Sequence, residues 1–269
     1  MKQLGAFNKV YFVGIGGIGM SALARFFKFQ GKQVAGYDKV ETPLTQALIA
    51  EGMDLHFEDL GADIPADFQD PEQTLIIYTP AIKELGELTY FKAHSFTILK
   101  RAEVLGLLTK TFQGLCVAGT HGKTTTSSLL AYLLSKIEVG CTAFLGGIAS
   151  NFDSNLVLNS KSPYAVIEAD EFDRSFLQLS PFAAIITAAD PDHLDIYGSN
   201  DAFVEGFRQF TMRIDPKGFC IQKEGLALQS LAPVFTYGIN SSTAHYSFSN
   251  LRFENGFQVA DLRMGTQHF

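Results

Sequence analysis

A glycine-rich loop between an apolar run and a helix-forming segment constrains the fold of this 269-residue chain more than any other stretch. The apolar run at 115–118 leads into Gly119-Thr120-His121-Gly122-Lys123-Thr124, and residues 125–135 favour a helix. Backbone N–H groups of such a loop, together with the positive end of the helix dipole, bind phosphate. The order of strand, loop and helix therefore predicts an α/β unit that holds a nucleotide.

The side chains of this loop suit nucleotide phosphates. Lys123 can reach the β- and γ-phosphates, and the Thr124 hydroxyl can bind Mg²⁺. The general pattern has a glycine five positions before Gly122, where this chain has Val117. A tight strand-to-helix turn with an exposed lysine is the alternative, and the double glycine in its strand–loop–helix order favours the phosphate loop.

A second glycine loop lies near the N-terminus. The apolar run at 9–13 leads into Gly14-Ile15-Gly16-Gly17-Ile18-Gly19, a G-x-G-x-x-G pattern that continues into a predicted helix over 18–30. A predicted strand at 33–37 ends at Asp38, at the distance typical of dinucleotide-binding units. The pattern predicts close approach of the backbone to a diphosphate, with Asp38 as acceptor for a ligand hydroxyl. A plain βαβ turn is the alternative.

Strands and helices alternate through the first part of the chain. Short predicted strands at 54–57, 74–78 and 96–99 alternate with predicted helices at 42–51 and 101–109. This alternation predicts an α/β fold with a doubly wound, mostly parallel sheet, and Thr79 follows one strand at the edge where such sheets bind ligands. We place a domain boundary in the polar segment at 110–114, which gives a Rossmann-like domain at 1–110 and a phosphate-loop α/β domain at 111–269.

An acidic cluster follows a predicted strand in the second domain. The strand at 164–167 leads into Glu168-Ala169-Asp170-Glu171-Phe172-Asp173. Four carboxylates in six residues cannot all be buried without partners. Carboxylate oxygens suit Mg²⁺, and Glu168, which directly continues the strand, is the best candidate ligand. A solvated acidic turn is the alternative.

A histidine follows the next predicted strand, at 183–187. His193 lies among Asp190, Asp192 and Asp195. A histidine in this setting can be a metal ligand, an acid–base group or a salt-bridged structural residue, and the local pattern leaves all three open.

Two further stretches of the second domain carry structural predictions. The segment 150–159, rich in asparagine and serine, is predicted to be a solvated loop. Glu254-Asn255-Gly256 predicts a hairpin between strands at 245–253 and 257–263.

Composition and charge narrow the choice of partners. The net charge of −7 disfavours nucleic acid or an anionic membrane as the main partner. The three cysteines, Cys116, Cys141 and Cys220, are scattered and odd in number, which favours the reducing cytoplasm. No apolar stretch approaches the roughly 18 residues of a membrane-spanning helix, and the N-terminus lacks the apolar region of a signal peptide.

Four motifs resemble those of the Mur ligases of peptidoglycan synthesis; they read, in order, GIGGIGMS, GTHGKTTT, EADEFDRSF and DHLDIY. The resemblance covers essentially the whole chain and is greatest to the member that adds the first amino acid. Members have an N-terminal UDP-binding domain, a central ATPase domain and a C-terminal Rossmann-like domain. We therefore expect this chain to hold the first two and to lack the third.

The resemblance implies roles for individual residues. The UDP-sugar site that it implies consists of Gly14, Gly16, Gly17, Ile18, Gly19, Asp38 and Thr79. The implied ATP site consists of Gly119, Thr120, His121, Gly122, Lys123, Thr124 and Thr125. It implies two Mg²⁺ ions, one on Thr124 and Glu168 and one on Glu168 and His193. Lys123, Glu168 and His193 are the catalytic residues that it implies.

The chain departs from the family at one place. An asparagine that members often have after the strand before the DH motif is Ala188 here, and Asp190 replaces a common glutamate. No contact by that asparagine is therefore predicted for this chain.

The implied activity is ATP-dependent joining of L-alanine to the carboxylate of UDP-N-acetylmuramate through an acyl phosphate. We expect the chain alone to bind the UDP-sugar but to form little product. The nearest alternative is the family member that attaches a preformed tripeptide to the same UDP-sugar in wall recycling. An NAD-dependent dehydrogenase and a non-catalytic nucleotide-sugar-binding module are alternatives of other classes, and the dehydrogenase leaves the second loop, Glu168 and His193 without roles.

Overall fold

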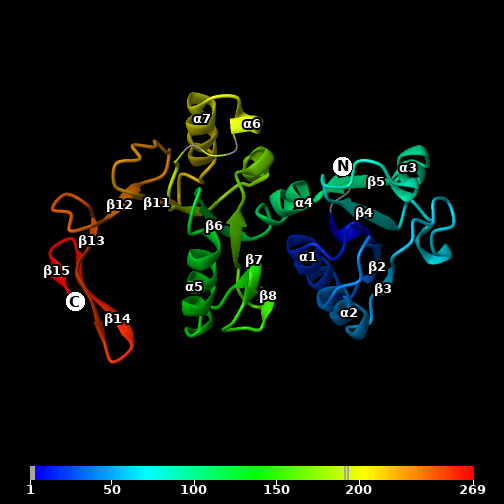
Figure 1. Cartoon of the computed structure of the whole chain (residues 1–269), viewed down its shortest axis with the longest axis horizontal. Coiled ribbons are helices and arrows are strands. Elements are labelled where there is room, and N and C mark those ends of the chain that lie inside the picture. The colour runs from blue at the N-terminus through cyan, green and yellow to red at the C-terminus, as the bar shows by residue number, and fades with distance from the viewer. Residues whose placement is uncertain (1–3, 191, 193) are drawn as a thin grey trace.

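The computed structural model describes residues 4–190, 192 and 194–269. Its helices and strands form two α/β units that follow one another along the chain (Figure 1). A short 3-10 helix, Leu4–Ala6, precedes the first unit. In Figure 1 helix α4 (Arg101–Leu108) lies between the two units.

The first unit is built on a parallel sheet that has five strands within the described residues, in the order β3-β2-β1-β4-β5. The strands are β1 (Lys9–Val13), β2 (Gln33–Tyr37), β3 (Asp54–His56), β4 (Thr74–Tyr78) and β5 (Thr97–Lys100). The connections contain α1 (Ile18–Phe29), α2 (Pro43–Ala50), a 3-10 helix (Ala66–Phe68) and α3 (Gly86–Ala93). This strand order is that of a doubly wound nucleotide-binding sheet.

Both faces of this first sheet are buried. Along β1, Val10 and Phe12 pack into the core on one face, and Tyr11 and Val13 pack into the core on the other. A strand buried on both faces is apolar throughout, because helices cover the two sides of the sheet. Ligands can therefore reach this sheet only where its strands end.

The second unit is built on a longer sheet, in the order β15-β14-β13-β12-β11-β10-β6-β9-β7-β8 within the described residues. Its strands are β6 (Gln113–Ala118), β7 (Thr142–Ala149), β8 (Ser154–Val157), β9 (Tyr164–Ala169), β10 (Ala183–Ile186), β11 (Phe219–Lys223), β12 (Val234–Ile239), β13 (Tyr246–Glu254), β14 (Phe257–Met264) and β15 (Gln267–His268). Its helices are α5 (Lys123–Ser135), a 3-10 helix (Phe172–Gln178), α6 (Leu194–Tyr197) and α7 (Asn200–Thr211). The neighbouring pairs among β7, β9, β6, β10, β11, β12 and β13 are parallel, and antiparallel strands end the sheet on both sides: β8 on one and β14 and β15 on the other.

The predicted α/β class is confirmed, and each of the two sheets carries one of the predicted glycine loops after a strand. The predicted hairpin is also confirmed, since Asn255 and Gly256 both have positive φ between antiparallel β13 and β14. The division at 110/111 stays a prediction and falls between the end of α4 and the start of β6. Among the described residues, no helix has the length and apolar character needed to cross a membrane.

The prediction of a solvated loop at 150–159 is wrong. Residues 154–157 form β8 on the edge of the second sheet, and the Asn155 side chain is fully buried. Its amide nitrogen donates to the Ile18 carbonyl (2.6 Å) and to Ser21 Oγ (2.8 Å), and its oxygen accepts from Arg25 Nη1 (2.7 Å). One polar residue of this stretch, Asn155, therefore makes a buried contact between the two units.

Candidate functional site

The first glycine loop connects the buried strand β1 to α1. Gly14 has φ +89°, and an added Cβ would lie 2.6 Å from Cγ2 of Thr79, at the end of β4. The Gly16 N–H donates to Asp38 Oδ2 (2.7 Å), which follows β2. The loop thus joins predicted UDP-site residues from three neighbouring strand ends.

The helix that follows this loop presents a free N-terminus. Gly17 is its N-cap, no side chain caps the first turn, and no acidic residue lies in that turn. The first N–H groups of a helix without such a cap are available to an anion. The local geometry therefore suits a phosphate at Gly17, Ile18 and Gly19.

The second glycine loop connects β6 to α5 and is held by the segment after β10. Gly119 has φ +142°, and a Cβ there would overlap Thr187 Oγ1. The Thr120 N–H donates to the Ala188 carbonyl (3.2 Å), and its hydroxyl donates to the Asp190 carbonyl (2.8 Å). Because Ala188 acts here through its backbone, the loop is supported without an asparagine side chain.

The departure at Val117 has a structural explanation. Val117 is fully buried inside β6, in register with Glu168 of β9 and Ile185 of β10. The strand therefore continues where the general pattern has its first glycine, and the loop begins at Gly119.

Lys123 lies folded over its own loop. Its Nζ is 2.9 Å from Oε1 and 2.7 Å from Oε2 of Glu171, and it also donates to the Gly119 carbonyl (2.8 Å). The Glu171 side chain is only 1% exposed. A carboxylate buried to this degree needs a cationic partner, and Lys123 is that partner.

Glu168 lies beside the second loop, but inside β9 and one residue before its end rather than after the strand as predicted. Oε1 accepts from the Thr124 hydroxyl (3.1 Å), and Oε2 accepts from the Gly146 N–H (3.1 Å). These carboxylate and hydroxyl oxygens are the donors that Mg²⁺ prefers. Among the described residues, no three His, Cys, Asp or Glu side chains are grouped to hold a metal, so water and phosphate oxygens would complete the shell. His193 lies outside the described residues.

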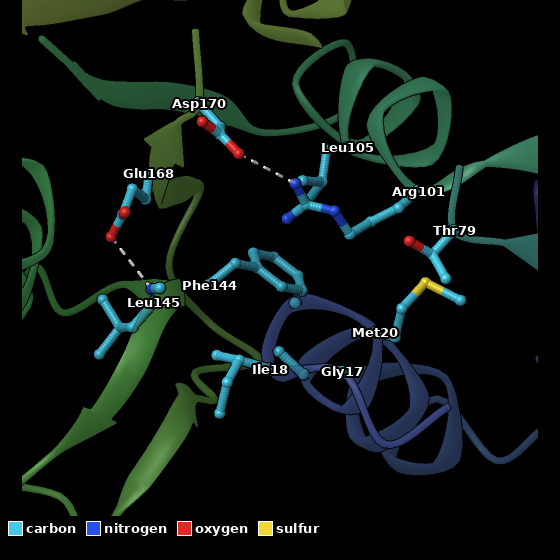
Figure 2. A pocket seen from close by; sticks show the side chains of 13 residues that line it. Gly17, Ile18, Met20, Thr79, Arg101, Leu105, Phe144, Leu145, Glu168 and Asp170 are labelled. Atoms are coloured by element: carbon cyan, nitrogen blue, oxygen red, sulfur yellow. Dashed lines mark hydrogen bonds and ion pairs between the residues drawn. The ribbon is translucent and has the colours of Figure 1, made fainter. Parts of the chain in front are cut away.

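A cavity of about 300 Å³ lies between the two units (Figure 2). Gly17, Ile18, Gly19 and Thr79 line it from the first unit, and Gly146 and Glu168 line it from the second. Its lining thus includes the first glycine loop and the Glu168 carboxylate, which is bonded to Thr124 of the second loop.

Comparison with known families assigns both halves of the chain. The model described as "Mur ligase family, catalytic domain" matches residues 9–113, and the model described as "Mur ligase middle domain" matches residues 117–266. The chain belongs to the Mur ligase family. The resemblance inferred from the four sequence motifs is therefore confirmed.

Similar Mur ligases are found among curated proteins and solved structures. A UDP-N-acetylmuramate–L-alanine ligase of Parabacteroides distasonis is 54% identical over 92% of this chain and 54% of that protein. One from Flavobacterium psychrophilum is 47% identical over 99% and 58%, respectively. The chain thus spans somewhat more than half the length of these relatives.

Two solved Mur ligases superpose well on the whole chain. The UDP-N-acetylmuramate:L-alanyl-γ-D-glutamyl-meso-diaminopimelate ligase of Neisseria meningitides has a TM-score of 0.85 at 25% identity, over 98% of this chain and 86% of that one. The UDP-N-acetylmuramate–alanine ligase of Thermotoga maritima has a TM-score of 0.82 at 28% identity, over 97% and 59%.

Sequence reasoning missed several residues of this Mur ligase site. Arg101 and Asp170 line the cavity and form an ion pair across it, and Glu171 pairs with Lys123. A basic residue directly after β5, at the carboxyl edge of the sheet, was the available signal for Arg101. The predicted ATP-site residues His121 and Thr125 have exposed side chains at the loop, and their roles stay predictions.

Proposed function

We propose that this chain provides the UDP-sugar site and the ATP site of a ligase that joins L-alanine to the carboxylate of UDP-N-acetylmuramate. The observation that carries the proposal is the single cavity lined by the first glycine loop and by Glu168, which is bonded to Thr124 of the second loop. The name shared by the curated relatives supports this choice of substrates.

The first loop would hold the UDP-sugar by its diphosphate. The uncapped N–H groups of Ile18 and Gly19 supply the donors, and the helix dipole adds partial positive charge. Asp38 and Thr79 would contact the uridine or sugar hydroxyls from the neighbouring strand ends. The cavity then leaves room for the sugar and its carboxylate to extend towards Glu168.

The second loop would hold ATP, and Lys123 would be the cation that contacts its phosphates. An incoming triphosphate offers Lys123 a stronger anionic partner than the Gly119 carbonyl that it now contacts. Lys123 on the β- and γ-phosphates would neutralise the charge that develops on the transferring phosphoryl group. Gly119 to Thr125 supply the surrounding loop and the first turn of α5.

The donors beside the second loop fit Mg²⁺. Thr124 and Glu168 would hold one ion, and Glu168 with His193 a second. When bound, Mg²⁺ supplies positive charge that lowers repulsion between the ATP phosphates and the substrate carboxylate.

The chemistry follows from what the two loops present. A carboxylate oxygen of the sugar attacks the γ-phosphorus of ATP, the bond to the bridging oxygen breaks, and ADP leaves. The L-alanine amine then attacks the acyl carbon of the resulting acyl phosphate, and a tetrahedral intermediate forms. Inorganic phosphate leaves, the amine loses a proton to solvent, and the amide bond remains.

A second candidate is the ligase that attaches a preformed tripeptide to the same UDP-sugar. The superposition on the Neisseria meningitides enzyme supports this second candidate, since 98% of the present chain is matched by that enzyme. Calorimetric titration of L-alanine and of the tripeptide into the chain saturated with UDP-N-acetylmuramate and MgATP separates the two candidates without requiring turnover.

We also propose that the chain acts in the cytoplasm and divides into domains near residue 110. The three cysteines are free and buried in the second unit, as suits a reducing compartment. The two sheets are separate, and helix α4 connects them.

Titration calorimetry with UDP-N-acetylmuramate and with NAD⁺ tests the proposed function. We expect one UDP-sugar to bind per chain and NAD⁺ to give no heat of binding. Tight binding of NAD⁺ with no binding of the UDP-sugar would contradict the ligase assignment and favour a dehydrogenase.

A further inference from the structure

Arg101 is placed to act on the ligand of the first glycine loop. It is the first residue of α4 and directly follows β5, at the carboxyl edge of the first sheet. Its side chain extends over the first turn of α1, since a Cβ added to Gly19 would overlap Arg101 Nη1 and lie 3.0 Å from Cδ. Gly19, the last glycine of the G-x-G-x-x-G pattern, therefore makes room for this guanidinium as well as for a ligand.

The guanidinium is held only loosely by the protein. Its partner is Asp170 Oδ2 at 3.7 Å, from the second unit, and both side chains are partly exposed (28% and 41%). Within the described part of the chain, Arg101 donates no hydrogen bond to protein, although a guanidinium carries five N–H donors. Loose, partly exposed ion pairs of this kind contribute little to stability.

The charges around the cavity make Arg101 distinctive. Of the described residues that line it, Arg101 is the one cation, whereas Glu168 and Asp170 are carboxylates. Lys123 lies in the other loop and is paired with Glu171. A diphosphate entering this cavity would meet backbone N–H groups, two carboxylates and a single positive side chain.

We infer that Arg101 binds the diphosphate of the UDP-sugar. The ion pair between Arg101 and Asp170 competes with this contact and breaks when the ligand binds. This rests on the proposed function. The guanidinium fork suits two phosphate oxygens, and a diphosphate beside it offers shorter, charge-assisted hydrogen bonds than Asp170 does. Figure 2 shows Arg101 pointing across the cavity towards Asp170, on the side of Thr79 and Met20.

Two substitutions with opposite expected effects test this inference. Arg101→Gln should weaken UDP binding at least tenfold, because charge-assisted hydrogen bonds to phosphate are lost. Asp170→Asn should tighten UDP binding about twofold, because the competing charge is removed. The asparagine oxygen can still accept from the Phe172 N–H, as Asp170 Oδ1 does at 3.2 Å.

Calorimetric titrations of the chain with UDP, UDP-N-acetylglucosamine and UDP-N-acetylmuramate give the readout. Arg101→Gln should weaken all three alike, since they share the diphosphate. The matched control is Arg208→Gln on α7, which removes the same charge from a solvent-exposed side chain and should change nothing. Unchanged melting temperatures would show that the variants remain folded.

Three outcomes would overturn the inference. Unchanged UDP affinity in Arg101→Gln removes any role at the diphosphate. Weakening confined to UDP-N-acetylmuramate assigns Arg101 to the sugar carboxylate instead. Equal weakening in Arg101→Gln and Asp170→Asn makes the pair a structural tie between the units. Failure of the unmodified chain to bind any of the three ligands contradicts the proposed function rather than the role of Arg101.

Discussion

Both glycine loops lead from a buried strand into a helix whose N-terminus has no side-chain cap, yet they differ in the charges around that helix end. The first loop carries no charged side chain of its own, and a single cation, Arg101, reaches it from α4. The second carries Lys123 within its own helix, already paired with the buried Glu171. The first arrangement suits an anchor for a substrate that stays intact, and the second suits a phosphoryl group whose charge changes during reaction.

The largest effect should come from removing the cation of the second loop. Lys123→Met should lower MgATP affinity about 100-fold, because its charge-assisted hydrogen bonds to phosphate are lost. It should also destabilise the fold by about 3 kcal/mol, because Glu171 is left buried without its partner. Binding of UDP-N-acetylmuramate should be unchanged. Titration calorimetry measures the two affinities, and denaturant unfolding measures the stability.

The double variant Lys123→Met/Glu171→Gln is the control for that experiment. It should recover most of the lost stability, because the uncompensated charge is removed, and it should leave MgATP binding impaired. Recovery of MgATP affinity in the double variant would contradict the assignment of Lys123 to the phosphates.

Substitutions in the first loop should weaken UDP-N-acetylmuramate binding through steric clashes rather than through the loss of a charge. Gly14→Ala forces a side chain into φ +89° and against Thr79, so UDP-N-acetylmuramate affinity should fall about tenfold and stability by about 1–3 kcal/mol. Gly5→Ala is the matched control, since Gly5 lies outside the cavity, has no positive φ, and an added Cβ there meets no atom within 4 Å. Equal effects of the two substitutions would contradict a steric cause at Gly14.

The contact between the two units predicts a smaller effect. Asn155→Ala should cost about 1–3 kcal/mol of unfolding free energy, because the buried Ser21 hydroxyl and the partly buried Arg25 guanidinium lose a partner. Asn151→Ala, four residues earlier and exposed, is the control. A thermal unfolding experiment compares the two, and an unchanged melting temperature for Asn155→Ala would show that the two units do not depend on this contact.

The smallest effect at neutral pH concerns the thiols of the second unit. Burial raises the pKa of Cys141 to about 11 and that of Cys220 to about 12, and it raises the pKa of Cys116 as well. Unfolded thiols ionise near pH 8.5, so their contribution to stability is full below about pH 8.5 and is lost as the pH rises towards the folded values. A thiol reagent at pH 8 should label none of the three in the folded chain and all three in urea; rapid labelling of the folded chain would contradict their burial.

Sequence reasoning located the features that local pattern determines. Both loops, Asp38 and Thr79 follow strand ends as predicted, and Glu168 lies in the last residues of β9, because parallel strands bring their carboxyl ends to one edge. The family assignment, drawn from short motifs, agrees with matches over most of the chain.

Sequence reasoning failed where residues distant in the chain meet. Asn155 lies in a polar stretch whose composition is typical of a loop, and only its contact with α1 explains its burial. Glu171 is one acid among several until Lys123 is found beside it. The sequence places Arg101 only at the start of a helix, and its position over Gly19 follows from the folded structure. Each depends on packing between elements, which no local spacing encodes.

The most direct test of the account is whether one chain binds both ligands at once. Calorimetry should titrate MgATP into the chain before and after saturation with UDP-N-acetylmuramate. If the two loops are separate sites, one lining the cavity and the other joined to it through Glu168, one MgATP should bind per chain in both titrations, and its heat should persist in the saturated chain. Displacement of one ligand by the other would contradict the account, because both would then occupy a single site.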